Sequence, residues 1–498
     1  MKSILGLDIG TSSVKGLLTD PDSQQSCSRT IEYRLEKDTS GRVESDPAVY
    51  WQSVLDVLAG LRADEPELFS AVRAVGVTSQ GETVIPVDAD GTPLRNAVVW
   101  LDSRAGQEAA EIASRFTLQT IYQTTGQQEV VPSATACVIK WLTRHEPRIT
   151  ERVCKYLLVQ DYIIFKLTSE FLTDRAMIPS TLLYDMTSGS WWSEMCEEVC
   201  VRPEQLPQPG SPSTAEVSAD AASETGLGKG VVVSTTPIDQ ITGAVGAGNI
   251  APAMLTETTG TALAVCATLD RPVHDPGMRM GLFHHAAPGC YALLPWAPVS
   301  GMILRWFRDE CCGDLSFNDM NRLAETVSPG SNGLLMLPHF EGSISPVSNP
   351  NARGILMGLT ISHTKAHIIR AIMESIAFLL RHNVDTLQTL GAGAEQIISL
   401  GGAARSPVWS QIKADVLNKP VVIPFCEETT CLGAAMIAGV SAGIFPDLKT
   451  AVEEVVRIRK TIDPSPENSK KYASAYQWYT TVNQCIHTQL NGGTPCTT

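Results

Sequence analysis

The chain has 498 residues, of which 43% are hydrophobic and 18% are charged, and its formal net charge at pH 7 is −15. This length and balance predict a globular protein of two or more domains with enough apolar residues for a large core. The acidic charge argues against a general nucleic-acid binder and against a protein that binds anionic membranes. It is compatible with a nucleotide that backbone N–H groups and Mg²⁺ hold locally.

The thirteen cysteines are scattered and include no C-x-x-C pair, which favours reduced thiols. No apolar run approaches the twenty residues of a membrane helix, and the chain enters its first apolar segment directly after Met1-Lys2-Ser3. From these features we expect a soluble cytoplasmic protein.

The first predicted element is a hairpin, with a short buried strand at 4–7 and its return strand at 14–18. The turn between them can offer several backbone N–H groups to a phosphate, and Gly10 allows that phosphate to approach closely. Asp8 stands at the strand end, where a hydrated Mg²⁺ between its carboxylate and the phosphate would explain it. An ordinary hairpin with a polar turn fits the same residues equally well.

Strands and helices then alternate. A strand is predicted at 31–35, and a helix begins at Asp46-Pro47 with Asp46 as its N-cap. Buried strands at 74–78 and 84–87 flank a polar loop, which is the place where an α/β sheet usually presents ligand-binding groups.

Helices are predicted at 105–116 and 135–141, and a strand that ends near 159 leads into another helix. A buried strand at 231–234 ends in a polar turn that contains Asp239, and a helix of small residues follows it.

The second half repeats the design of the first hairpin. Residues 255–265 form a strand, a Thr-Gly-Thr turn and a second strand, about 250 residues after the first turn. A buried strand at 397–400 runs into Gly401-Gly402 before a helix at 408–417. A long helix is predicted at 363–380, and a turn with a small-residue helix at 427–435 is expected to close the second domain. No G-x-x-x-x-G-K-[ST] motif occurs, which argues against a P-loop enzyme.

The two turns and the double glycine resemble the two phosphate motifs and the adenosine motif of the actin-like ATPase superfamily. Their order resembles that of the FGGY carbohydrate kinases, from Ile4 to about Gly443. The resemblance implies an α/β fold of two actin-like (ribonuclease H-like) ATPase domains flanking a nucleotide cleft. It implies a sugar-binding domain with the first phosphate motif at 1–245, a nucleotide-binding domain at 246–498, and ATP and Mg²⁺ as cofactors.

The resemblance also implies roles for individual residues. Asp239 matches the aspartate that is the general base in FGGY kinases, and Asp8 and Asp239 are expected to hold Mg²⁺. The structural alternative for Asp239 is a helix N-cap, and both roles can coexist. The residues expected around the sugar are Gln80, Gly81, Glu82, Asp102, Asp239 and Gln240. The residues expected to bind the nucleotide are Gly10, Thr11, Ser12, Ser13, Lys15, Gly260, Thr261, Gly301, Arg305, Gly401, Gly402, Ala403 and Ser406.

Some of these assignments have a structural alternative. Gln80, Glu82 and Asp102 suit sugar hydroxyls because carboxylates and amides form directed hydrogen bonds, but they also fit an ordinary surface loop. Lys15 follows the phosphate turn and fits either a phosphate contact or an exposed side chain.

Two departures from the glycerol kinase pattern bear on the substrate. Gly81 stands where that pattern has an arginine, and Ser133 stands where it has a tyrosine. The vacated space suits a ketopentose such as D-xylulose, although the Gln-Met-His-Gly of many xylulose kinases is absent at 80–83. The alternatives are ribulose, gluconate, erythritol or glycerol.

Three functions are compatible with the motifs: a sugar kinase of the FGGY type, an ATP-gated chaperone or filament protein of the same fold, and a catalytically silent sugar-binding regulator. The loop at 80–82 and Asp239 favour the kinase, because the filament and chaperone functions need no polyol pocket. The expected partners are a sugar or polyol and, as one option, a second copy in a homodimer; no nucleic acid and no membrane are expected.

Overall fold

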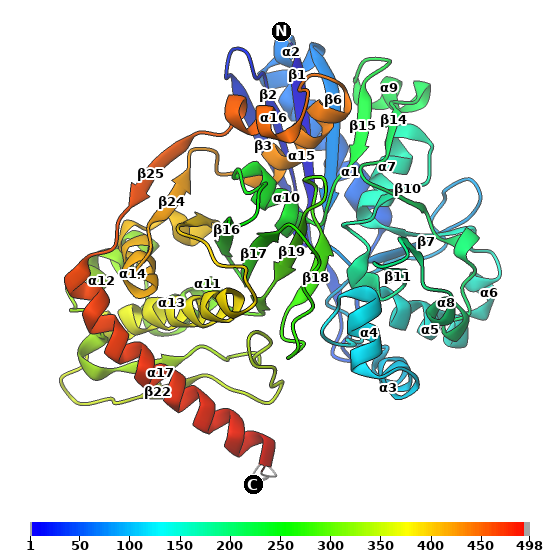
Figure 1. The fold of residues 1–498 in the computed structure, drawn as a ribbon. Helices are drawn as coiled ribbons and strands as arrows, with labels where there is room; N and C mark the ends of the chain where they lie inside the picture. The colour runs from blue at the N-terminus through cyan, green and yellow to red at the C-terminus, as the bar shows by residue number, and fades with distance from the viewer. Residues whose placement is uncertain (1, 493–498) are drawn as a thin grey trace. The chain divides into compact units, whose positions relative to one another are not determined.

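The computed structural model describes residues 2–492, with side chains described as far as residue 487. The chain forms two compact units (Figure 1). The first contains the chain up to Ile250 together with Asp270–Ala292 and Glu428–Val456. The second contains Ala251–Leu269, Leu293–Glu427 and the chain from Arg457 onward. Both units are therefore discontinuous, whereas the domains expected from the sequence, 1–245 and 246–498, are continuous.

The first unit is built on a six-stranded sheet in the order β14-β15-β6-β1-β2-β3. The strand β1 (Ser3–Ile9) pairs antiparallel with β2 (Ser13–Thr19) and parallel with β6 (Val72–Ser79). The outer strands are β3 (Ser26–Glu32), β15 (Val232–Thr235) and β14 (Thr214–Glu216). The strand expected at 31–35 therefore begins earlier, because β3 pairs with β2 along its whole length at an exposed edge that lacks an apolar pattern.

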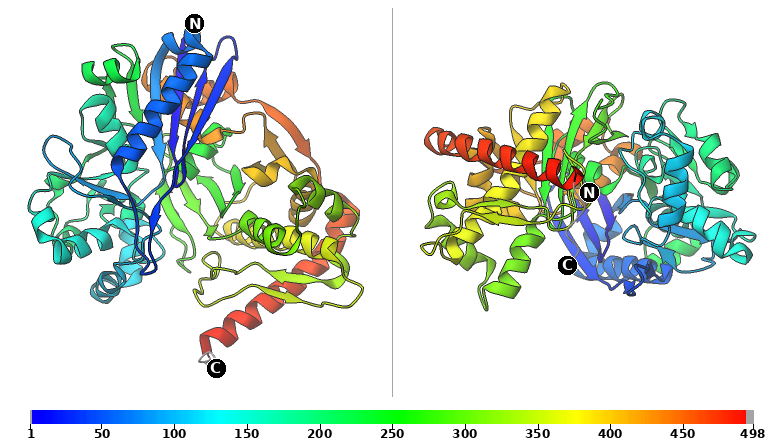
Figure 2. Two further views of the ribbon diagram at one scale, coloured as in Figure 1. Left: turned by 180° about the vertical axis from the view of Figure 1, so that it is seen from behind. Right: turned by 90° about the horizontal axis from the view of Figure 1, so that it is seen from below.

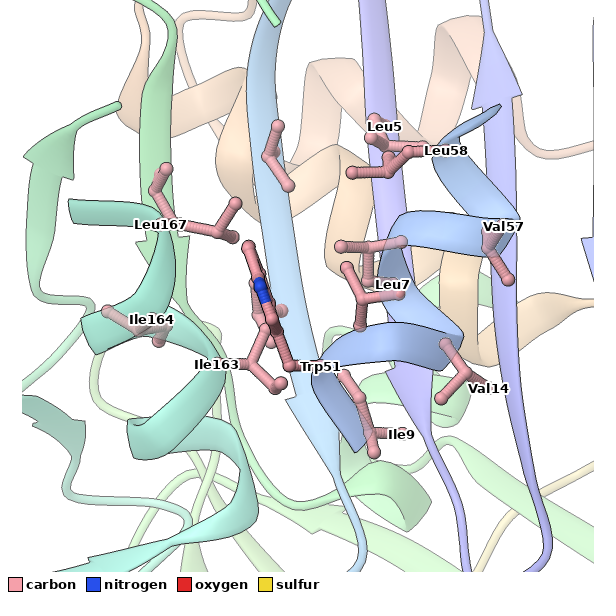
Figure 3. Packing of buried hydrophobic residues seen from close by; sticks show 14 of the residues in the cluster. Leu5, Leu7, Ile9, Val14, Trp51, Val57, Leu58, Ile163, Ile164 and Leu167 are labelled. Atoms are coloured by element: carbon pink, nitrogen blue, oxygen red, sulfur yellow. The ribbon is translucent and has the colours of Figure 1, made fainter. Parts of the chain in front are cut away.

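Alternate residues of β1 face opposite sides of this sheet. Leu5, Leu7 and Ile9 pack against α1 (Pro47–Asp64) and α7 (Val159–Thr168). Figure 3 shows these three side chains beside Trp51 and Leu58 of α1, and Figure 2 shows α1 along the same face of the sheet. Ile4 faces the other side, in a cluster with residues of α15 (Thr429–Ser441).

The contact between α15 and this sheet depends on glycine. A Cβ atom on Gly6 of β1 would collide with the Cys431 carbonyl oxygen, and one on Gly76 of β6 would collide with the Ala434 carbonyl oxygen. The same is true of Gly433 in α15 against Thr242 of α10 (Asp239–Gly246). The helix at 429–441 thus lies in the first compact unit, although it stands near the end of the chain.

A five-stranded sheet in the order β4-β5-β8-β7-β9 forms the other part of the first unit. Its strands are β4 (Glu36–Lys37), β5 (Val43–Ser45), β8 (Ala97–Val98), β7 (Val84–Val87) and β9 (Lys155–Leu158). The remaining elements of this unit are α2 (Pro66–Ser70), α3 (Gly106–Arg115), α4 (Leu118–Thr125), α5 (Thr135–His145), α6 (Pro147–Thr150), β10 (Leu172–Asp174), η1 (Pro179–Thr181), β11 (Tyr184–Asp185), β12 (Ser190–Trp191), α8 (Ser193–Glu198), η2 (Pro203–Gln205), β13 (Gln208–Gly210), α9 (Ala219–Thr225), β18 (Gly281–His284) and α16 (Leu448–Val455), and β19 (Tyr291–Leu294) continues into the second unit.

The second unit contains a strand series with the same local design. The order is β17-β16-β23-β24-β25, with β16 (Leu255–Thr259) antiparallel to β17 (Leu263–Leu269) and parallel to β23 (Ile397–Leu400). The remaining elements are β20 (Trp296–Ala297), α11 (Gly301–Cys311), α12 (Phe317–Glu325), η3 (Ser331–Gly333), β21 (Leu335–Leu337), β22 (Ile355–Met357), α13 (Lys365–Thr389), η4 (Gly402–Arg405), α14 (Pro407–Leu417), β24 (Val421–Pro424), β25 (Ile458–Ile462) and α17 (Pro466–Gly492). No helix in the described part of the chain is both long and apolar enough to cross a membrane.

We predict that Gly6→Ala destabilises the first unit by about 1–3 kcal/mol or more, because the added methyl group must displace the backbone of α15. Gly106→Ala is the matched control, since a Cβ atom at that position meets nothing within 4 Å. Urea unfolding followed by circular dichroism compares the two variants. Equal midpoints for Gly6→Ala and the wild type would show that α15 does not approach β1 this closely.

Candidate active site

Asp8 is the next-to-last residue of β1 and lies on the same face of the sheet as Ile4 and Gly6, the face that α15 covers. Its Oδ1 atom is buried and has no hydrogen-bond partner among the described residues. Burial raises the pKa of Asp8 to about 6, although the charge of Lys15 acts in the opposite direction. Burial therefore disfavours the charged form of this carboxyl group.

Asp239 is the first residue of α10, and Ile238 rather than Asp239 occupies the N-cap position. The Gln240 N–H donates a hydrogen bond of 2.8 Å to Asp239 Oδ1. Burial raises the pKa of Asp239 well above its usual range, and the negative charges of Asp8 and Glu82 raise it further. The carboxyl groups of Asp8 and Glu82, from distant parts of the first unit, thus both lie close enough to Asp239 to disfavour its charge.

Glu82 is held by its neighbours in an uncommon backbone conformation, with φ of 57°. The Thr135 hydroxyl donates a hydrogen bond of 2.9 Å to the Glu82 carbonyl oxygen. Burial raises the pKa of Glu82, and the nearby Ser180 hydroxyl opposes that shift. At the preceding residue, a Cβ atom on Gly81 would lie 2.8 Å from Ile238 Cδ1. The loop is therefore packed directly against the residue that precedes Asp239.

Three other residues expected around the sugar have different surroundings. Both oxygens of Asp102 accept hydrogen bonds from the Arg104 guanidinium, at 2.9 and 2.7 Å, and the Val43 N–H donates to Oδ2 at 2.6 Å. The Gln80 amide is buried beside Tyr50, and neither of its polar atoms forms a hydrogen bond with a described residue. The Gln240 side chain is exposed. The structure thus brings Gly81, Glu82 and Asp239 together and gives Asp102 a structural ion pair.

The turn at residues 10–13, the first turn, has some of its polar groups engaged within the protein. The Gly10 N–H donates to the Ser13 carbonyl oxygen at 3.0 Å, and the Trp100 indole N–H donates to the Thr11 hydroxyl at 2.9 Å. Ser12 is exposed. Lys15 forms an ion pair of 2.7 Å with Glu428, next to α15. The expected phosphate contact of Lys15 would therefore compete with a partner 413 residues away in the sequence.

The turn at residues 260–262, the second turn, is tied to α11. The Ser300 N–H donates to the Thr261 carbonyl oxygen at 2.8 Å, and the Gly301 N–H donates to the Gly260 carbonyl oxygen at 2.9 Å. A Cβ atom on Gly301 would collide with that same carbonyl oxygen, whereas one on Gly260 would meet nothing within 4 Å. Gly301 is thus needed for internal packing, and Gly260 leaves open space in front of the turn. Arg305 is exposed on α11.

The two residues of the double glycine differ in the same way: one is needed for the backbone conformation and the other leaves open space. Gly401 has φ of +78°, which favours glycine, and a Cβ atom on Gly402 would meet nothing within 4 Å. Ala403 is buried in the core of the second unit. The Ser406 hydroxyl accepts from the Trp409 N–H at 3.2 Å as the N-cap of α14 and donates to Asn321 Oδ1 at 2.8 Å. Of this set, only Gly402 combines exposure with open space.

Sequence reasoning missed a buried ion pair that holds these two motifs in place. Lys413 of α14 and Glu257 of β16 are both fully buried, and their Nζ and Oε1 atoms lie 2.6 Å apart. Ser399 and Thr259 also donate hydrogen bonds to the Glu257 carboxylate. The only sequence signal for this ion pair was a lysine within the apolar pattern of 408–417. Its partner was not deducible, because the two residues are 156 positions apart.

Comparisons with known proteins agree with this architecture. The models of the N-terminal and C-terminal domains of the FGGY family of carbohydrate kinases match residues 3–246 and 255–442. The xylulose kinase of Lactococcus lactis subsp. lactis is 29% identical over 482 residues, which cover 96% of this chain and 95% of that protein. The gluconokinase of Bacillus subtilis is 27% identical over 508 residues, which cover 98% and 96%. The crystal structure of xylulose kinase from Lactobacillus acidophilus superposes with a TM-score of 0.91 at 24% identity, over 99% of this chain and 100% of that one, and confirms the expected fold.

We predict that Asp8→Asn stabilises the protein at pH 7.5, by an amount on the order of 3 kcal/mol for a pKa raised from 3.8 to about 6. The folded state binds this proton more tightly than the unfolded state, so the wild-type free energy of unfolding falls as the pH rises from about 4 to about 6. Urea unfolding at pH 4 and pH 7.5 measures the difference, which should disappear at the lower pH. Asp102→Asn is the contrasting variant, because it breaks a buried ion pair and should destabilise the protein. A stability gap of Asp8→Asn that does not change with pH would contradict the prediction.

Proposed function

Because this chain belongs to the FGGY family of carbohydrate kinases, it is a phosphotransferase, and we propose that it transfers the γ-phosphoryl group of ATP to a hydroxyl group of a ketopentose such as D-xylulose. One observation carries the proposal: Asp8 and Glu82 both lie near Asp239, whose pKa their charges raise, and burial raises the pKa of all three carboxyl groups. Carboxyl groups with raised pKa values gathered in one place are typical of a functional site.

Asp239 is the proposed general base. A base is most effective when its pKa lies near the working pH, and burial together with two negative neighbours raises the pKa of Asp239 in that direction. The hydrogen bond from the Gln240 N–H fixes Oδ1, which leaves Oδ2 to accept the proton of the attacking hydroxyl group. The position at the start of α10 also favours the negative charge of the carboxylate.

Asp8 and Asp239 are the proposed ligands of Mg²⁺. The unpartnered Oδ1 atom of Asp8 and the repulsion between the two carboxylates fit a divalent cation. Among the described residues no group of three or more His, Cys, Asp or Glu side chains forms a complete metal site. Mg²⁺ is commonly held by one or two carboxylates, with water and phosphate as its other ligands. When bound, the ion would neutralise charge on the phosphate oxygens.

Each unit contains residues that we propose as nucleotide ligands. In the first unit, residues 10–13 would contribute backbone and hydroxyl donors. In the second unit, Gly260, Thr261 and Gly402 would contact the nucleotide, because no side chain of the protein fills the space where a Cβ atom of either glycine would lie. We assign Gly301, Ala403 and Ser406 an indirect role, in which they fix the shape of the backbone around this nucleotide site.

The size of the proposed substrate follows from two small residues. Gly81 and Ser133 replace larger side chains of the glycerol kinase pattern, and a sugar of five or six carbons has hydroxyl groups to fill the space. A three-carbon polyol would leave polar groups there without partners. A cytoplasmic location and a homodimeric assembly remain expectations from the sequence.

Asp239→Asn should lower kcat by about 10²-fold or more, because amide groups do not accept the hydroxyl proton. ATP binding, measured by calorimetry, should persist. Asp220→Asn, an exposed aspartate of the same unit, serves as the matched control and should keep full activity. Near-normal turnover by Asp239→Asn would remove this residue from the mechanism.

Turnover of ATP with a panel of sugars tests the substrate. We expect kcat/KM to be higher for xylulose and ribulose than for erythritol and glycerol, because each unpartnered polar group costs on the order of 1–3 kcal/mol. Glycerol as the best substrate would show that the effect of Gly81 and Ser133 has been misjudged. ATP hydrolysis that no sugar stimulates would contradict the kinase assignment itself.

A further inference from the structure

The first turn has several of its main-chain carbonyl groups occupied within the protein. The Tyr33 hydroxyl donates to the Gly10 carbonyl oxygen, and the Tyr33 N–H donates to the Ser12 carbonyl oxygen at 2.9 Å. The Gly10 N–H donates to the Ser13 carbonyl oxygen at 3.0 Å. By contrast, neither the Thr11 N–H nor the Ser12 N–H has an acceptor among the described residues. The turn thus has occupied acceptors and free donors, which is the arrangement that an anion needs.

Tyr33 directly follows β3 and is held in place by packing. Its ring meets the Tyr50 ring of α1 edge to face, with centroids 5.5 Å apart. Burial raises the pKa of Tyr33, and the neighbouring Tyr50 and Asp8 raise it further. The hydroxyl therefore keeps its proton and donates it to the Gly10 carbonyl oxygen. Without this donor, that oxygen would place negative partial charge beside the phosphate that we propose at the turn.

Trp100 contacts both the first turn and the loop that carries Glu82. Its indole N–H donates to the Thr11 hydroxyl at 2.9 Å, and its main-chain N–H donates to the Thr83 hydroxyl at 3.1 Å. Thr83 directly follows Glu82 and is fully buried. One residue therefore connects the proposed phosphate site with the proposed sugar site, inside the first unit.

The segment around Trp100 is firmly held, so that the indole has a defined place. The Val99 N–H donates to the Val43 carbonyl oxygen at 3.0 Å, and the Val43 N–H donates to Asp102 Oδ2 at 2.6 Å. The same carboxylate forms an ion pair with Arg104. The structural ion pair of Asp102 thus fixes the segment that reaches the first turn.

The indole N–H decides how the Thr11 hydroxyl can be used. An indole N–H donates and does not accept, whereas a hydroxyl group has one hydrogen and two acceptor lone pairs. Because Trp100 occupies a lone pair of Thr11 Oγ1, the hydroxyl hydrogen points away from the indole and is free to donate. Thr11 is partly exposed, so a ligand at the turn can accept this hydrogen.

We propose that Tyr33 and Trp100 are positioning residues of the phosphate site, because they occupy acceptors of the first turn and leave its N–H groups and the Thr11 hydroxyl to bind the phosphates of ATP. This inference rests on the proposed function, which places those phosphates at the turn. Trp100 also fixes the phosphates relative to the sugar, since it holds Thr83 beside Glu82. Both aromatic residues act through the turn and need not touch the nucleotide.

Trp100→Phe and Tyr33→Phe each remove one donor and keep an aromatic ring. Each should raise the Kd for MgATP, measured by calorimetry without sugar, at least about fivefold, because a hydrogen bond to a charged group is weakened. KM for ATP should rise by a similar factor. KM for the sugar should change less than about twofold, so the two variants separate a phosphate effect from a general loss of structure.

Two matched controls remove the same kinds of donor elsewhere in the first unit. Trp191→Phe deletes an indole N–H that donates to the Pro207 carbonyl oxygen at 3.2 Å. Tyr122→Phe deletes a hydroxyl that donates to the Met280 carbonyl oxygen at 2.9 Å. Both should keep the wild-type Kd for MgATP, and a rise in either that equals the rise in Trp100→Phe or Tyr33→Phe would overturn the proposal.

A double-mutant cycle tests whether Trp100 acts through Thr11. Thr11→Val removes the hydroxyl that the indole orients, so adding Trp100→Phe to Thr11→Val should raise the Kd less than about twofold further. Fully multiplied effects of the two substitutions would contradict the role of Trp100. Tyr33→Phe, which loses a single oxygen atom, tests the proposal even where Trp100→Phe does not fold, and an unchanged Kd in Tyr33→Phe would overturn it.

The results separate this inference from the proposed function. If sugars are phosphorylated while Tyr33→Phe and Trp100→Phe bind MgATP as the wild type does, the positioning role is wrong and the kinase assignment stands. If no sugar is phosphorylated but both variants bind MgATP more weakly, the positioning role stands and the proposed acceptor is wrong.

Discussion

The close contact of α15 with β1, β6 and α10 is the constraint on which the candidate site depends. Gly6, Gly76 and Gly433 allow backbone to approach backbone at three points, and a single methyl group at any of them would collide with a carbonyl oxygen. This contact fixes the end of β1, where Asp8 lies, relative to the start of α10, where Asp239 lies. It also brings Glu428 to Lys15. A segment near the end of the chain therefore determines the geometry of a site whose proposed catalytic residues lie in the first half.

The carboxyl groups of Asp8, Glu82 and Asp239 lower the free energy of unfolding when they are charged. Each of the three has a pKa raised by burial, and Asp239 is further affected by both of the others. A group whose pKa is raised in the folded state contributes less to the free energy of unfolding as the pH rises through that range. The buried Asp102 contrasts with them, because it is paired with Arg104, which also forms an ion pair with Glu44. Unfavourable electrostatics confined to one place are typical of a functional site.

Local sequence patterns predicted what local forces determine. The two hairpins, the double glycine and the strand before Asp239 all appear in the structure, because strand alternation and turn glycines are properties of short segments. Contacts between residues that are distant in the sequence could not be predicted from local patterns. The Lys15–Glu428 pair and the burial of Gln80 beside Tyr50 depend on tertiary packing. The small residues of the helix at 429–441 likewise predict close packing but not its partner.

The two turns illustrate why similar local sequences need not have the same chemistry. In each unit an antiparallel hairpin carries an acidic residue on its first strand, and that strand pairs in parallel with a later strand. In the second unit Lys413 neutralises this acid, Glu257, inside the core. In the first unit Asp8 keeps a buried oxygen without any partner, and its pKa is raised. The proposed cation therefore belongs at the first turn, and the proposed nucleotide contacts of the second turn come from backbone groups alone. One buried lysine, on a helix remote in sequence, accounts for the different surroundings of the two acids.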